Sequence, residues 1–166
     1  MDNFIEVGKI VNTFGIKGEL KIISDFEYKD KVFTKDFPMY IGELKIKELV
    51  RSHRVHKNYD LTTFKGYTNI NEILKYKGNK VFVKREDLGL NNNDYLLSDL
   101  IGFEVYDEDK LLGIVLDYEL TPSNVLLKVK GSKTFYLPKV DVYIKEINVS
   151  NKKIMTNKGS DLIIWE

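Results

Sequence analysis

The spacing of apolar residues is the feature that most restricts how this chain can fold. Over most of its 166 residues, apolar side chains recur at alternate positions, and turn residues interrupt these runs at short intervals. A period of two is typical of β-strands, whose successive side chains point to opposite faces. The sequence therefore predicts an all-β fold. In the first half we expect the strands Phe4–Val11, Glu19–Ile23, Met39–Ile41, Leu44–Val50, Arg54–Phe64 and Lys80–Lys84.

One segment of the first half departs from this alternation and predicts a short helix. Asn69 is followed three residues later by Glu72, which is the spacing of a capping box at a helix N-terminus. The apolar residues between and after them share one helical face, and Gly78 is a typical stop signal. We expect a helix from about Ile70 to Lys77 that closes one end of a barrel.

The segment 90–94, with the sequence LNNND, is the clearest linker. Adjacent asparagines favour turns and have no apolar surface to bury. We therefore expect two domains, residues 1–89 and 94–166, that move independently in the free protein. Short antiparallel strands beyond the linker predict a second small barrel, closed or nearly closed. They are Phe103–Tyr106, Leu112–Tyr118, Val125–Val129, Thr134–Leu137, Val142–Val149, Lys153–Thr156 and Leu162–Trp165.

Charge is almost balanced over the whole chain but differs between its halves. The net charge is +1, yet residues 1–90 hold 17 basic and 13 acidic side chains, whereas the remainder holds 9 and 12. This asymmetry suits RNA as a partner of the first half and a basic protein as a partner of the second, although differences of this size also arise by chance.

The absence of cysteine and of any long apolar stretch predicts a cytoplasmic protein without membrane contact.

Motifs for catalysis and metal binding are missing. No segment has the spacing of a phosphate-binding loop. His53 and His56 are three residues apart on an expected strand and would point to opposite faces, so we expect no metal site. Asp107 and Asp109 begin like a calcium loop, but Leu112 occupies the position of its glycine and Tyr118 the position of its bidentate glutamate. We expect no enzyme activity and no cofactor.

The loop Gly15–Gly18, with the sequence GIKG, is the most informative short motif. A tight turn with an exposed lysine can approach a phosphate backbone closely, as in some RNA-binding modules. Alternation predicts that Lys9 and Lys21, together with Lys17 in the loop that extends the strands, share one face. These lysines either form a stripe that faces phosphates or are ordinary solvated side chains.

In its wider context this loop resembles a known family. Residues 7–22, VGKIVNTFGIKGELKI, resemble the opening signature of the RimM ribosome maturation factors, which usually have glycine in place of Asn12 and histidine or arginine in place of Phe14. Residues 66–88 resemble the helix and closing strand of that family's first domain. Residues 95–105 and 112–115, together with Leu137-Pro138, resemble its PRC-barrel domain. The resemblance covers nearly the whole chain in the family's order.

The resemblance implies an N-terminal translation-factor-like barrel with one short helix and a C-terminal PRC barrel. It implies a monomer that binds the head of the immature 30S subunit, assists small-subunit assembly and 16S rRNA maturation, and docks onto ribosomal protein S19. Contacts with rRNA or the ribosome are expected from Lys9, Thr13, Phe14, Gly15, Lys17, Gly18 and Lys21. Contacts with the ribosomal protein are expected from Tyr95, Leu96, Leu97, Asp99 and Leu100.

Several of these residues also have simpler interpretations. Gly8, Gly102 and Pro138 are expected to be structural, and Tyr95, Leu97 and Leu100 could plug a barrel end instead of docking a partner. Family members commonly carry two adjacent aromatics and a tryptophan at positions 95–97, so two aromatic anchors are missing from this chain.

Two other functions remain open, an RNA-processing or RNA-modifying enzyme and a general RNA-binding barrel. The first requires a cleft with titratable groups of shifted pKa, and the second predicts binding to arbitrary RNA in moderate salt.

Overall fold

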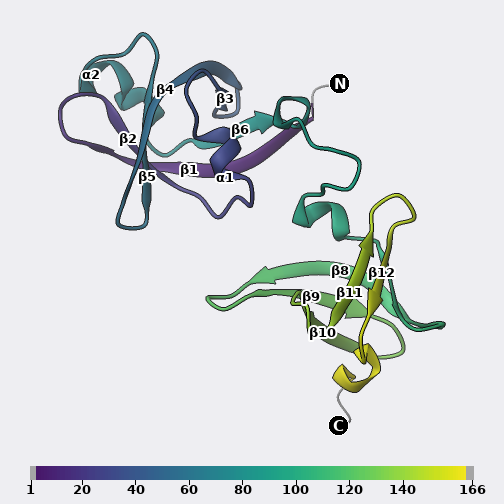
Figure 1. Cartoon of the computed structure of the whole chain (residues 1–166). Coiled ribbons are helices and arrows are strands. Elements are labelled where there is room, and N and C mark those ends of the chain that lie inside the picture. The colour runs from purple at the N-terminus through teal and green to yellow at the C-terminus, as the bar shows by residue number, and fades with distance from the viewer. Residues whose placement is uncertain (1–2, 164–166) are drawn as a thin grey trace. The chain divides into compact units, whose positions relative to one another are not determined.

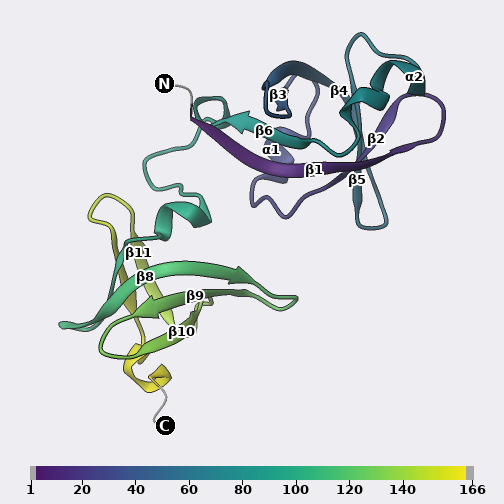
Figure 2. The same ribbon diagram turned by 180° about the vertical axis from the view of Figure 1, so that it is seen from behind.

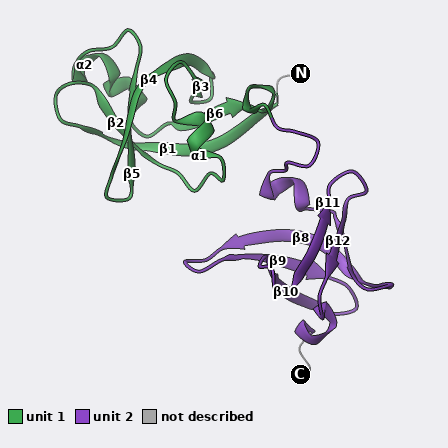
Figure 3. Cartoon of the chain, in the orientation of Figure 1, with its two compact units in different colours: residues 1–89 green, residues 90–166 purple. Residues whose placement is uncertain are grey.

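The protein consists of two compact units, residues 1–89 and 90–166, in a computed structural model that describes residues 3–163 (Figure 3). Strands make up most of the regular structure of both units, which confirms the predicted all-β fold (Figure 1). None of the helices within the described range is long and apolar enough to cross a membrane.

Unit 1 is a closed barrel in which the strands follow the order β1-β2-β5-β4-β3-β6. The strands β3, β4 and β5 follow one another in reverse order, so β2 pairs with β5 and β3 pairs with β6, which joins residues far apart in sequence. Its elements are β1 (Phe4–Phe14), β2 (Glu19–Ile23), α1 (Lys29–Val32), β3 (Pro38–Ile41), β4 (Ile46–His56), β5 (Tyr59–Phe64), α2 (Ile70–Ile73), η1 (Leu74–Tyr76), β6 (Lys80–Lys84) and η2 (Arg85–Leu88).

The predicted strand Arg54–Phe64 is wrong, because the chain turns within it. β4 ends at His56 and β5 begins at Tyr59, and the two strands pair in antiparallel orientation. Lys57 has a φ of +55°, which is uncommon for a residue other than glycine, asparagine or aspartate. Asn58, the second residue of the turn, is a common turn residue, but a single asparagine was not enough to indicate the turn.

The capping box at Asn69 is confirmed, although the helix is shorter than predicted. The Asn69 side chain accepts a hydrogen bond from the Asn71 amide at 3.0 Å, and the Glu72 carboxylate accepts one from the Asn69 amide at 3.1 Å. The Thr68 amide also donates a hydrogen bond to the Glu72 carboxylate, and this bond is the largest cause of a Glu72 pKa below its ordinary value, followed by the bond from the Asn69 amide. The α-helix ends at Ile73 and continues as one turn of 3₁₀-helix. The short helix α1 was not predicted.

β1 is 11 residues long and carries two β-bulges. One lies between Glu6 and Gly8 opposite β6, and the other lies between Ile10 and Asn12 opposite β2. A bulge adds one residue to a strand and so changes which residues share a face beyond it. Figure 2 shows β1 running along unit 1 from the N-terminal side to the hairpin with β2.

Unit 2 is built on one six-stranded sheet of order β10-β9-β8-β7-β12-β11. All of its pairs are antiparallel except β12 with β7, whereas only antiparallel strands were expected. Its elements are η3 (Leu97–Leu100), β7 (Glu104–Asp107), β8 (Lys110–Leu120), β9 (Val125–Lys130), β10 (Thr134–Pro138), β11 (Ile144–Asn148), β12 (Lys153–Thr156) and η4 (Gly159–Leu162).

The expected final strand Leu162–Trp165 lies partly outside the described residues, and its described part, Leu162 and Ile163, is not a strand. Leu162 ends the 3₁₀-helix η4, and Trp165 lies outside the described residues. Leu162 and Ile163 pack against the core of unit 2. Their apolar character therefore reflects burial at the end of a short helix, which a strand pattern of this length cannot distinguish.

Candidate functional site

The β1–β2 hairpin positions the GIKG loop at one end of the barrel. Phe14 ends β1 and pairs with Glu19, so the turn between them is shorter than the segment 12–18 that separates the predicted strands Phe4–Val11 and Glu19–Ile23. The Ile70 amide donates a hydrogen bond to the Ile16 carbonyl at 3.1 Å, which ties the start of α2 to the loop. Gly18 has a φ of +91°, a conformation that favours glycine. The backbone of this loop is therefore fixed, while the Lys17 side chain is exposed to solvent.

A cluster of basic and aromatic side chains surrounds Phe14 on the outer face of the barrel. We call Phe14, Lys21, Arg54, His56 and Tyr59 the Phe14 cluster. The Phe14 and His56 ring centroids are 5.0 Å apart. The Lys21 Nζ lies 4.8 Å from the Tyr59 ring centroid and 5.5 Å from that of Phe14. The Arg54 Cζ also lies 5.5 Å from the Phe14 ring centroid. Cations beside aromatic rings suit a ligand with both phosphates and flat bases.

One acidic residue partly neutralises this cluster. Arg54 donates two hydrogen bonds of 2.9 Å to the two carboxylate oxygens of Glu19. This bond is the largest cause of a Glu19 pKa below its ordinary value, and the positive charges of Arg54, His56 and Lys17 add to it. The same bond raises the pKa of Arg54. Lys17, Lys21 and Arg54 carry three positive charges against the one of Glu19, so the surface remains basic.

Lys9 lies further along β1, on the same face as Lys21. Lys9 pairs with Ile23 on β2 and Lys21 pairs with Asn12 on β1. Directly opposed residues of an antiparallel pair share a face, and Lys21 and Ile23 are two residues apart, so all four side chains point outward. Simple alternation would have put Lys9 and Asn12 on opposite faces. The bulge between Ile10 and Asn12 brings them to the same one.

Three members of the Phe14 cluster were not among the predicted site residues. Arg54, His56 and Tyr59 come from β4 and β5, and they reach Phe14 because β5 pairs with β2. Lys21 is paired with Leu61 in that ladder. No local motif links positions 54–59 to position 14, so only the strand order of the barrel reveals the full cluster.

The five predicted protein-docking residues fall into two groups. Leu96, Leu97 and Leu100 are buried, with 1%, 9% and 0% of their surfaces exposed, and Leu97 and Leu100 belong to the core of unit 2. Such side chains cannot contact a partner while the core is closed, so they have a packing role in the free protein. Asp99 accepts a hydrogen bond from the Leu96 amide at 2.9 Å and thereby caps η3.

Tyr95 is the aromatic residue of this set, and it is partly exposed. It is partly buried against the core of unit 2, and the Lys139 Nζ lies 5.2 Å from its ring centroid. Tyrosine combines a large apolar ring with a polar hydroxyl, which is why it is frequent in protein interfaces. The candidate docking surface is therefore centred on Tyr95.

The three residues predicted to be structural lie at defined points of the backbone. A Cβ at Gly8 would lie 2.5 Å from the Ile23 carbonyl oxygen, which leaves no room for a side chain. Gly102 has a φ of +94°, and its amide donates a hydrogen bond to the Val115 carbonyl at 2.8 Å. Pro138 ends β10 and pairs with Leu126.

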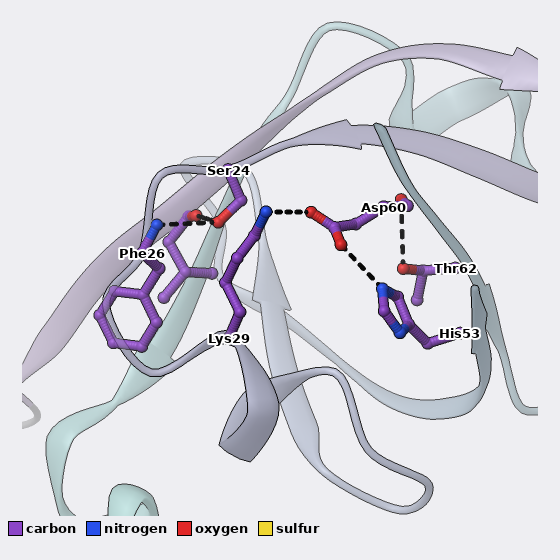
Figure 4. Close-up of polar contacts among 7 residues, drawn as sticks. Ser24, Phe26, Lys29, His53, Asp60 and Thr62 are labelled. Atoms are coloured by element: carbon purple, nitrogen blue, oxygen red, sulfur yellow. Dashed lines mark hydrogen bonds and ion pairs between the residues drawn. The ribbon is translucent and has the colours of Figure 1, made fainter. Parts of the chain in front are cut away.

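A second polar cluster in unit 1 surrounds Asp60. Its Oδ1 lies 2.8 Å from the His53 Nε2, and its Oδ2 lies 2.7 Å from the Lys29 Nζ (Figure 4). The His53 ring stacks on Phe33 with centroids 4.8 Å apart. The Asp60 side chain is 4% exposed. The cluster joins α1 to the β4–β5 hairpin, so it acts as a clamp between segments that the strand ladder does not connect.

No metal site is formed within residues 3–163. No group of three or more histidine, aspartate or glutamate side chains in this range could hold an ion, and the chain has no cysteine. His53 and His56 contact different partners, Asp60 and Phe14.

Both units match known protein domains. Residues 5–88 match the RimM N-terminal domain, and residues 97–162 match the RimM PRC barrel domain. The chain is 38% identical over 164 residues to the ribosome maturation factor RimM of Staphylococcus aureus strain NCTC 8325, and the aligned region covers 96% of this chain and 98% of that protein. The RimM protein of S. aureus strain JH9 shares the same identity and coverage.

A solved structure also aligns with this chain. It is a crystal structure of a putative 16S ribosomal RNA processing protein RimM from Pseudomonas aeruginosa, with 20% sequence identity. The alignment covers 96% of this chain and 99% of that one, with a TM-score of 0.44.

Proposed function

Because this chain belongs to the RimM family, we propose that it is a ribosome maturation factor that binds the head of the immature 30S subunit through rRNA and ribosomal protein S19. It assists small-subunit assembly and 16S rRNA maturation in the cytoplasm, as a monomer and without a cofactor. The observation that carries the proposal is the presence of both family domains in order along the chain, and unit 1 adds the basic aromatic Phe14 cluster.

Unit 1 supplies the contact with rRNA in this proposal. Lys9, Lys17 and Lys21 approach phosphates, and Thr13, Phe14 and the glycines of the loop bring the backbone close to the RNA. Arg54 and Tyr59 extend this contact. Phosphate contacts provide most of the affinity of such a surface, whereas aromatic rings stack on unpaired bases.

Unit 2 supplies the contact with ribosomal protein S19. The second half of the chain has three more acidic than basic residues, which complements a basic ribosomal protein. Tyr95 provides an aromatic anchor, and Asp99 holds the segment in shape through its bond to the Leu96 amide.

Binding alone accounts for the effect on assembly. A ligand that prefers one conformation of the rRNA shifts the population toward that conformation by its difference in affinity. The proposal therefore requires tighter binding to the immature subunit than to the mature one, and it requires no bond-making step.

The decisive experiment is a pulldown with tagged full-length protein at moderate salt. We expect immature small subunits to be enriched over mature ones among the recovered particles, because the factor must leave when the head reaches its mature form. The measurement is the ratio of precursor to mature 16S rRNA in the eluate. Equal recovery of both particles, or of neither, would contradict the proposal.

The Tyr95→Ala variant tests the protein contact separately. We expect it to weaken binding to isolated ribosomal protein S19 by about tenfold or more, since aromatic anchors at interfaces commonly contribute about 2 kcal/mol or more, which is about thirtyfold. Calorimetric titration measures the affinity. Tyr143→Ala is the matched control, because Tyr143 is also partly buried against the core of unit 2. Equal losses in both variants would remove Tyr95 as the docking residue.

The alternative function, an RNA-processing or RNA-modifying enzyme, would rest on the Asp60 cluster. A hollow of about 450 Å³ is lined by Lys29, Tyr59 and Asp60, among other residues. However, both carboxylate oxygens of Asp60 are already engaged, one by Lys29 and one by His53. A general base must have an oxygen or nitrogen available to the proton that it removes. The arrangement therefore favours the clamp over catalysis.

A further inference from the structure

A second basic aromatic cluster lies at the opposite end of β1. We call Phe4, Tyr40, Lys45, Phe82 and Lys84 the Phe4 cluster. The Lys45 Nζ lies 4.1 Å from the Phe82 ring centroid and 5.6 Å from that of Phe4. The Lys84 Nζ lies 5.1 Å from the Tyr40 ring centroid and 5.8 Å from that of Phe4. The Phe4 and Tyr40 rings meet edge to face at 5.2 Å. The cluster thus repeats the chemistry of the Phe14 cluster with different strands.

The strand register places this cluster on the outer face of the barrel. Phe4 pairs with Lys84, and Glu6 pairs with Phe82, which in turn pairs with Tyr40. The residues that alternate with them, Val81 and Val83, are fully buried. Phe4 and Phe82 are only partly buried, so their rings remain accessible at the surface, whereas Tyr40 is 7% exposed and packs against Phe4.

Both clusters lie on one continuous face of β1. Its outward residues are Phe4, Glu6, Lys9, Asn12 and Phe14, as their pairing with outward residues of β6 and β2 shows. Lys9 is three residues away from both Glu6 and Asn12, and in a regular strand residues three apart point to opposite faces. One bulge lies in each of these two intervals, so Glu6, Lys9 and Asn12 point to the same face. Without these bulges, Lys9 would point into the barrel.

Between its two aromatic ends, this face and the neighbouring β6 carry two lysines, Lys9 and Lys80, against one acidic residue. Lys9 lies midway along β1, beside Lys80 of β6 and Ile23 of β2. The acidic residue of this β1 face is Glu6, which lies 3.3 Å from the Lys80 Nζ in an exposed pair. Exposed pairs of this kind contribute little to stability, so Lys80 can exchange Glu6 for a phosphate at low cost.

We propose that the outer face of β1 is a track for single-stranded RNA, with unpaired bases on the Phe14 and Phe4 clusters and phosphates beside Lys9 and Lys80. The proposal rests on the proposed function and specifies the form of RNA that unit 1 binds. Ten steps of about 3.3 Å give β1 a length of roughly 33 Å, enough for several nucleotides. An RNA duplex would not fit this chemistry, because its bases are stacked on one another and cannot reach the rings.

The test uses the full chain and a fluorescent oligouridine of about ten nucleotides, within the usual site size of such surfaces. Uridine runs form no duplex, so the probe is single-stranded. We expect the double variant Phe4→Leu, Phe82→Leu to bind the probe about tenfold more weakly, because leucine keeps the apolar volume but cannot stack on a base. Phe37→Leu, in unit 1 but outside both clusters, should bind like the original protein. Circular dichroism verifies that each variant is folded.

Crosslinking with 4-thiouridine in the same probe locates the RNA. The track predicts crosslinked peptides from both ends of β1. Crosslinks confined to the Phe14 end, unchanged affinity of the double variant, or equal affinity for a duplex of the same length would overturn the proposal. A variant that keeps probe affinity but loses immature subunits in the pulldown would also overturn it, by assigning the Phe4 cluster to a protein partner. Enrichment of immature subunits by the original protein is measured independently, so the proposed function can stand if the track fails.

Discussion

Replacing Leu100 with alanine is expected to lower the free energy of unfolding of unit 2 by about 2–5 kcal/mol, the usual range for a leucine deleted from a core. Leu100 is fully buried and belongs to the core cluster of unit 2. The substitution removes apolar burial and leaves a cavity that the surrounding strands can fill only in part. Hydrogen exchange of the full chain, followed by mass spectrometry, measures the change in stability separately in each unit.

The matched control for this prediction is Leu111→Ala. Leu111 lies in the same unit on β8 but is 49% exposed, so the same deletion should change stability by no more than about 0.5 kcal/mol. The comparison also decides between the two roles considered for Leu100. A Leu100→Ala protein that stays as stable as the control, yet no longer binds ribosomal protein S19, would make Leu100 a docking residue and not a core residue.

The double charge reversal Lys21→Glu, Arg54→Glu is expected to weaken binding to precursor 16S rRNA by about a hundredfold at low salt. Each reversal removes a cation that can neutralise a phosphate and adds a repulsive charge, and Arg54→Glu also places a second carboxylate beside Glu19. The dependence of affinity on salt should become less steep, by about 0.7 to 0.9 in logarithmic slope for each phosphate that the variant no longer neutralises. Filter binding at several salt concentrations measures both quantities.

A control with the same change in net charge is Lys35→Glu, Lys77→Glu. Both lysines are exposed in unit 1 and lie outside the Phe14 and Phe4 clusters. This variant should keep much more of its affinity, and its salt slope should stay close to that of the original protein. Similar effects in the two double variants would mean that the total charge of unit 1, and not the Phe14 cluster, governs RNA binding.

Local sequence patterns predicted some features of both units and missed others. The GIKG loop, the capping box at Asn69 and most strand positions follow from short stretches of sequence, because turns, caps and alternation depend on neighbouring residues. The turn at Lys57 was missed, since its backbone conformation is unusual for lysine. The core role of Leu97 and Leu100 remained one of two alternatives, because a buried leucine and an interface leucine look the same in sequence.

The sequence by itself determined the all-β class, the two-part organisation and the family, because these depend on periodicity, on turn residues and on motifs that are contiguous in the chain. Only the tertiary structure decided which side chains meet. Arg54 and Tyr59 join Phe14 through the pairing of β5 with β2, and Lys9 faces outward with Phe4 and Phe14 because of two bulges. Strand order and bulges arise from pairing between distant segments, and such pairing leaves no regular signal in the residues nearby.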